Sequence, residues 1–148
     1  MTADYDTRHN YRIITLQRLF EKEFKLCNPN LATEYNFDNL QLIEATDLED
    51  YDTELVDTLI GEIDRLTPQI DELITELAPE WPISSISKID LSILRMAIAE
   101  GFILKITPQK VVINEAIELS KEFSNDQTRK FVSGVLGNLF SNQKELIK

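Results

Sequence analysis

The stretch VVINEAIELSKEFSNDQTRKFVSGVLGNL, residues 111–139, indicates the fold class of this chain. In its first half, apolar residues from Val112 to Phe123 recur at helical spacing, so one broad face must be buried. In its second half, apolar residues again return every three or four positions. Ser124 and Gln127 have the spacing of a capping box that starts the second helix. The stretch therefore predicts a helical hairpin.

Two glycines, Gly134 and Gly137, lie inside the second helix of this hairpin. Glycine costs about 1 kcal/mol relative to alanine in a helix interior. Two glycines within four residues therefore predict that another backbone passes close to this face.

Apolar periodicity predicts helices in most of the remaining chain as well. Two Thr-Pro pairs, at residues 67–68 and 107–108, have the pattern of an N-cap followed by proline in the first turn. The expected helices cover about Asp6–Lys25, Asp52–Leu66, Thr67–Leu77 and the stretch after Ser87, with a short apolar segment at Phe37–Ala45.

We expect an all-α protein, a compact helical fold of two packed helical bundles in a single domain that covers residues 1–148. The segment APEWPISSIS, from Ala78, interrupts the helical pattern and predicts a division into bundles at about 1–80 and 81–148. A tryptophan beside two prolines is typical of a packing anchor, so Trp81 is expected to plug the seam; a platform for stacking a base is the alternative.

The segment from Ser87 to Glu100 combines a helix start with buried charges. Ser87 and Asp90 have the spacing of a second capping box. Arg95 and Glu100 lie among apolar residues, where an unpaired charge is costly, so we expect both to be paired, with Glu115 as one candidate.

The composition excludes several classes of protein. With one cysteine and one histidine, the chain lacks a constellation for zinc. It also lacks a Gly-rich phosphate loop and a nucleophile elbow, so no catalytic residue, metal site or cofactor is expected. No apolar run approaches the ~20 residues that span a membrane, and the N-terminus lacks the features of a signal peptide. We expect a cytoplasmic protein that is not an enzyme.

The net charge of −11 is distributed unevenly. Residues 1–33 carry a net charge of +1, residues 34–80 carry −14, and residues 81–148 carry +2. The ends can therefore still bind a phosphate backbone. The acidic middle is either a solvated face or a docking surface for a basic protein.

Three linked motifs carry a family resemblance: ILRMAIAE from Ile93, INEAIELSKEF from Ile113, and RKFVSGVLGNL from Arg129. Together they closely resemble the C-terminal half of the NusB transcription antitermination family, from about Trp81 to Leu139. The resemblance extends to the first helix, whereas the middle of the chain matches in length and helical character. It implies an RNA-binding adaptor that pairs with ribosomal protein NusE on single-stranded boxA-like RNA of ribosomal RNA transcripts, within the transcription elongation complex.

The resemblance also implies positions for the binding sites. Arg8 and Arg12 keep part of the basic first helix of the family, and they are expected on the solvent side of its first turns. Lys130 and Phe131 correspond to the RNA contact at the last helix. Asp90, together with Phe20, is assigned to the contact with NusE.

Four positions depart from the family pattern: His9, Asn10, Ser133 and Gly137. They favour an alternative, in which the chain keeps the fold as a protein-interaction module, or as a homodimer, with lost or weak RNA binding. The alternatives differ in salt dependence, because RNA binding weakens steeply with ionic strength whereas an apolar interface does not.

Overall fold

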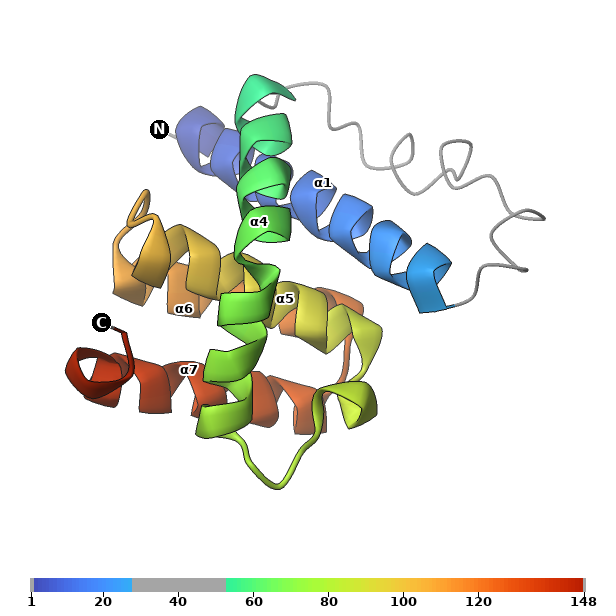
Figure 1. Ribbon diagram of the computed structural model, residues 1–148. Coiled ribbons are helices and arrows are strands. Elements are labelled where there is room, and N and C mark those ends of the chain that lie inside the picture. The colour runs from blue at the N-terminus through green and yellow to red at the C-terminus, as the bar shows by residue number, and fades with distance from the viewer. Residues whose placement is uncertain (1, 28–52, 148) are drawn as a thin grey trace. The chain divides into compact units, whose positions relative to one another are not determined.

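The computed structural model describes residues 2–27 and 53–147, and within these residues every regular element is a helix (Figure 1). The all-α prediction is confirmed. The short segment expected at Phe37–Ala45 lies outside the described residues. The elements are α1 (Thr2–Cys27), α4 (Thr53–Leu77), the 3-10 turn η2 (Ile83–Ser85), α5 (Lys88–Ile98), the π-helical turn η3 (Ala99–Ile103), α6 (Gln109–Phe123) and α7 (Asp126–Leu146).

The chain divides into two compact units, Met1–Ile60 and Gly61–Lys148, which we describe separately. Helix α4 begins in the first unit and ends in the second. The bundle boundary that the sequence predicts near residue 80 stays a prediction. In the described part of the chain, no helix combines the length and apolar character needed to cross a membrane.

Helix α5 is the centre of the second unit. Every residue from Asp90 to Glu100 is buried, and α5 contacts both α6 and α7. A helix that is buried on all sides must satisfy each polar side chain internally. Arg95 does so through α4: its Nε and Nη2 donate to the two carboxylate oxygens of Asp71 at 2.9 and 2.8 Å. The prediction that Arg95 is paired is confirmed.

Helices α6 and α7 form the predicted hairpin and run beside each other (Figure 1). Their facing apolar residues are fully buried, among them Val112, Leu119 and Leu136. The capping prediction is wrong by one position. Asn125 caps α7 in a reciprocal box with Thr128, whose backbone N–H lies 3.0 Å from Asn125 Oδ1, because Ser124 still ends α6 in an extended conformation.

Neither Thr-Pro pair starts a helix in the predicted way. Pro68 lies inside the continuous helix α4, where the hydroxyl of Thr67 donates to the carbonyl oxygen of Ile63 at 2.6 Å, as residues in mid-helix do. The hydroxyl of Thr107 donates instead to a carboxylate oxygen of the buried Glu100, also at 2.6 Å. The buried carboxylate of Glu100 needs a hydrogen-bond donor, so the hydroxyl of Thr107 bonds to it instead of capping the next helix.

The close approach between helices lies at Gly101 rather than at the glycines of α7. A Cβ atom at Gly101 would lie 3.0 Å from Cγ2 of Val112, whereas nothing lies within 4 Å of a Cβ at Gly134 or Gly137. The expectation of a backbone close to α7 is therefore wrong. Gly101 belongs to η3, and its missing side chain lets this turn pack directly against α6.

Alanine substitutions at Gly134 and Gly101 are expected to change the free energy of unfolding in opposite directions. We expect Gly134→Ala to raise the free energy of unfolding by up to ~1 kcal/mol, because it gains helix propensity without a clash. Gly101→Ala should lower it by about 1 kcal/mol, because overpacking against Val112 outweighs the same gain. Thermal and urea unfolding would measure both, with Gly137→Ala as a second exposed control. A Gly101→Ala protein as stable as the wild type would contradict the packing described at η3.

The ion pair of Arg95 also predicts a stability effect. Asp71→Asn should lower the free energy of unfolding by about 2 kcal/mol, because it leaves the largely buried guanidinium without its counter-charge while Asp71 itself keeps some solvent. Glu62→Gln is the matched control, since it breaks the exposed ion pair with Arg65 and should cost less than ~1 kcal/mol. Equal losses in urea unfolding would refute the difference between the two pairs.

Candidate RNA and partner interface

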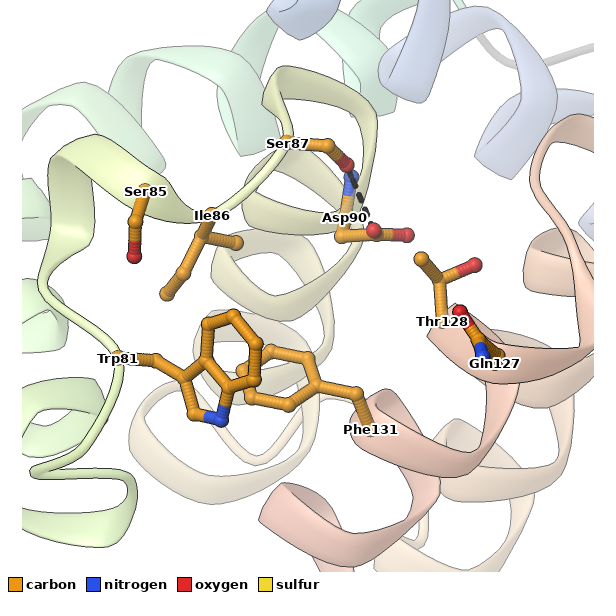
Figure 2. Close-up of a pocket in the computed structure, with 8 residues that line it drawn as sticks. All are labelled: Trp81, Ser85, Ile86, Ser87, Asp90, Gln127, Thr128 and Phe131. Carbon is orange, nitrogen blue, oxygen red and sulfur yellow. Dashed lines mark hydrogen bonds between the residues drawn. The ribbon is translucent and has the colours of Figure 1, made fainter.

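A pocket of about 450 Å³ opens where the start of α5 meets the start of α7 (Figure 2). It brings together two residues that the family resemblance assigns to different partners, Asp90 and Phe131. The loop before α5 and the first turns of α7 supply the rest of the lining, which comprises Trp81, Ser85, Ile86, Ser87, Gln127 and Thr128. The pocket combines aromatic walls with a few hydroxyl, amide and carboxylate groups, and such a mixture is typical of binding sites.

Asp90 is held at this pocket by the helix start that the sequence predicts. Ser87 is the N-cap of α5, and its hydroxyl oxygen accepts from the backbone N–H of Asp90 at 3.3 Å. The same hydroxyl donates to Oδ2 of Asp90 at 2.6 Å. The carboxylate therefore lies in the first turn of α5, where the helix dipole stabilises negative charge. The predicted cap is confirmed, with the Ser87 hydroxyl rather than its N–H as donor to the carboxylate.

One oxygen of Asp90 is left without a partner. The residue is 2% exposed, and its Oδ1 is buried with no hydrogen bond. Buried polar atoms nearly always have a partner, and an ionised carboxylate accepts through both oxygens. The start of α5 therefore holds an unsatisfied acceptor at the lining of the pocket.

Trp81 and Phe131 form the aromatic wall of the pocket (Figure 2). Their ring centroids lie 5.9 Å apart and their planes meet at 68°, an edge-to-face arrangement. Trp81 is 50% exposed, so the expectation that it plugs a seam is wrong. The Pro79–Pro82 segment turns the indole outward beside α7 rather than into the core.

Lys130 precedes Phe131 on α7 and is exposed to solvent. Its neighbour Arg129 lies 3.8 Å from a carboxylate oxygen of Asp126, so part of its charge is compensated within the helix. Lys130 therefore offers a cation next to the aromatic wall. Its assignment to RNA stays a prediction.

The other three predicted residues lie on α1, in the first unit. Because α1 begins at Thr2, Arg12 lies well inside the helix, and its side chain is only 3% exposed. The guanidinium carbon lies 4.9 Å from the centroid of the Tyr11 ring. The expectation that Arg12 faces solvent is thus wrong, since all residues from Tyr11 to Leu16 are buried. Arg8 lies on the same helix.

Phe20 is half-buried on α1, and its ring packs against Phe24 with centroids 6.2 Å apart. Its assignment to a partner stays a prediction. Among the described residues, no group of three or more histidine, cysteine or carboxylate side chains could hold a metal ion.

Sequence reasoning kept a binding role for Trp81 only as the alternative and missed Thr128 as part of the site. A usable signal existed for Trp81, because only a short segment separates it from the N-cap Ser87, so it must lie near the start of α5. Thr128 had no such signal, since its place depends on where α7 begins.

Comparison with known proteins gives a consistent family match. Residues 9–141 match the NusB family. The chain is 39% identical over 140 residues to transcription antitermination protein NusB of Enterococcus faecalis, covering 90% of this chain and 88% of the relative. It is 35% identical over 145 residues to the protein of the same name from Roseiflexus castenholzii, covering 95% and 96%.

Solved structures show the same fold. The chain aligns to T. maritima NusB with a TM-score of 0.70 and 28% identity, over 90% of each chain. It aligns with a TM-score of 0.66 and 22% identity to a chain in the crystal structure of antitermination factors NusB and NusE in complex with dsRNA, covering 91% of this chain and 96% of that one.

The burial of Arg12 predicts a structural role that can be measured. Arg12→Gln should lower the free energy of unfolding by about 1–3 kcal/mol, because it removes a buried cation together with its packing on Tyr11. Arg18→Gln, at an exposed position of the same helix, is the control and should change stability by less than ~0.5 kcal/mol. Equal midpoints in urea unfolding would contradict the buried position of Arg12.

Proposed function

The chain belongs to the NusB family, and on that premise we propose that it is an RNA-binding transcription antitermination factor that acts together with ribosomal protein NusE. Its RNA is a single-stranded boxA-like element of ribosomal RNA transcripts, and it works within the transcription elongation complex. The role is one of binding rather than catalysis.

The observation that carries this proposal is the pocket between α5 and α7. It places Asp90, assigned to the partner, and Phe131, assigned to RNA, in one lining. A single surface of the second unit thus has one group for a protein and one for a base, and a cation at Lys130 beside it. Such a surface suits a factor whose partner and RNA are bound next to each other.

The charges give a physical reason for the partnership. A chain with a net charge of −11 repels RNA at long range, and Lys130 alone supplies little attraction. A basic partner that holds the same RNA adds its own phosphate contacts and raises the effective concentration of the RNA at the weak site. We therefore expect tight RNA binding from the pair rather than from this chain by itself.

Within the proposed RNA surface, the roles differ by residue. The exposed Lys130 neutralises a phosphate, and Phe131, which lines the pocket, stacks a base. Arg8, on α1 of the first unit, is a separate candidate for a phosphate contact. Arg12 is left out, because a side chain that is 3% exposed has little surface to offer a phosphate.

The test is a fluorescence-anisotropy titration of a boxA-like RNA, single-stranded and duplex, against a scrambled RNA, with and without the cognate NusE at two salt concentrations. We expect sequence-selective binding of the single strand that requires NusE. Equal binding of the scrambled RNA would refute the proposal and leave a helical protein-interaction module.

Two variants locate the RNA surface in the same titration. Lys130→Gln should reduce the slope of log affinity against log salt by about 0.7, the value for one phosphate of a single strand. Phe131→Leu should weaken binding by about 1–3 kcal/mol with little change in that slope, because it removes stacking on one base. Lys110→Gln removes an equal charge from the exposed start of α6 and is the control. If all three behaved alike, the assigned RNA surface would be wrong.

A further inference from the structure

Helix α7 has no charged residue from Phe131 to Gln143, although the chain has a net charge of −11. By contrast, α4 carries seven carboxylates and one arginine. Lys130 precedes the uncharged stretch and Lys144 follows it, and both lysines are exposed. A polyanion that runs along α7 therefore meets a cation at each end of this stretch and no carboxylate of the helix between them.

The charge of Lys144 is available to an anion. Lys144 forms no ion pair with a described residue, whereas Lys121 and Arg129 of the same hairpin lie 3.3 and 3.8 Å from a carboxylate oxygen. The exposed Glu145 follows it in sequence, but adjacent residues of a helix do not face each other. Lys144 is thus a cation whose charge no neighbouring side chain compensates directly.

Phe140 offers an exposed ring four residues before Lys144. Its side chain is 36% exposed, and its ring contacts no other aromatic ring of the described residues. Although α7 leaves helical geometry at Asn142, the amides of Gln109 and Gln143 bond reciprocally at 2.7 and 2.9 Å and hold this end of α7 on the start of α6. A ring held in this way can stack any of the four bases.

The surface between Phe131 and Phe140 is open. Phe131, Gly134, Gly137 and Phe140 recur every three positions, and such a row runs obliquely across a helix. The nine positions between the two rings correspond to half a turn around the helix and ~14 Å along its axis, so the row crosses the outer side of α7. Both glycines are exposed, and nothing lies within 4 Å of a Cβ at either position. No side chain obstructs this crossing.

We propose that single-stranded RNA next to the boxA-like element follows this row from Phe131 to Phe140, where one base stacks on Phe140 and a phosphate binds Lys144. The inference rests on the proposed function, because the RNA held at Lys130 and Phe131 is the RNA of that proposal. At ~3.4 Å per stacked nucleotide, about four nucleotides cover the ~14 Å between the rings. The affinity of this chain for RNA therefore depends on the length of the RNA beyond the element.

A flanking RNA segment fits this surface better than an acidic protein. One exposed lysine and one half-exposed ring give little affinity to a partner that must bind through them alone. A flank that is joined to an element already bound at the start of α7 has a high effective concentration, so weak contacts are enough to hold it. Stacking on Phe140 also needs a flat ring, which every nucleotide supplies.

The experiment compares three RNAs by fluorescence anisotropy in the presence of NusE: the boxA-like element alone, and the element with six adenosines added at its 5′ end or at its 3′ end. Six nucleotides are enough to reach Lys144 beyond Phe140. We expect one of the two extensions to tighten binding by roughly fivefold or more, the effect of one stacked base.

Three variants locate the added contact on α7. Phe140→Leu should remove most of the gain from the extension, and Lys144→Gln should reduce the slope of log affinity against log salt by about 0.7 for the extended RNA only. Gly137→Gln should also remove the gain, because its side chain obstructs the crossing. It should not lower the free energy of unfolding, since glutamine has the higher helix propensity. Lys121→Gln removes an equal charge from α6 and is the control, which should affect the short and extended RNAs equally.

Two further measurements test the individual contacts. If the six adenosines are replaced by abasic nucleotides, the dependence on Phe140 should disappear while the dependence on Lys144 remains, because the phosphates are kept. A photoreactive p-benzoylphenylalanine in place of Phe140 should crosslink to the extended RNA and not to the element alone. If Phe140→Leu fails to fold by circular dichroism, Lys144→Gln at its exposed position carries the test.

The outcomes distinguish this inference from the function on which it rests. A wild-type chain that does not bind the boxA-like element with NusE overturns the proposed function. Binding of the element without a gain from either extension overturns the inference alone. A gain that persists in all three α7 variants assigns the flank to NusE, and the inference is wrong. Weaker NusE binding by Phe140→Leu or Lys144→Gln without RNA would make this surface a protein contact, which likewise overturns it.

Discussion

The burial of α5 on all sides is the constraint on which the second unit depends. A fully buried helix leaves no polar side chain to solvent, so each one fixes a neighbouring element. Arg95 holds α4 through Asp71, and Glu100 takes the hydroxyl of Thr107 in the loop before α6. At the amino end, Asp90 is held by Ser87. The helix therefore sets the positions of its surroundings through specific donors and acceptors as well as through apolar packing.

The proposed binding site follows from this arrangement. Asp90 belongs to the first turn of the central helix and lines the surface pocket at the same time, so its position is as well defined as that of the core. The aromatic wall comes from two other segments, with Trp81 in the loop before α5 and Phe131 on α7. Rigid elements hold each group, which reduces the entropy that binding must overcome.

Much of the fold and part of the site could be predicted from the sequence. The helices of the hairpin, the helix beginning after Ser87 and the place of Asp90 in its first turn follow from local spacing. That Arg95 is paired follows from the cost of a buried charge, whereas its partner Asp71 lies 24 residues away and could not be predicted. The half-exposed position of Trp81 could not be predicted, because a tryptophan beside prolines packs inward or outward according to what lies next to it. Arg12 was misplaced for the same reason: its charge predicts solvent, whereas its neighbours bury it.

By itself, the sequence determined the all-helical class, the hairpin of α6 and α7, and the N-terminal cap of α5, since these depend on periodicity and on contacts between residues a few positions apart. The tertiary structure alone decided the rest. In the folded chain the close approach between helices lies at Gly101 rather than at Gly134, and the hydroxyl of Thr107 donates to Glu100. Asp90 and Phe131 line one pocket. Each of these outcomes joins residues of different elements, and the periodicity of one element holds no information about which group of another element packs against it.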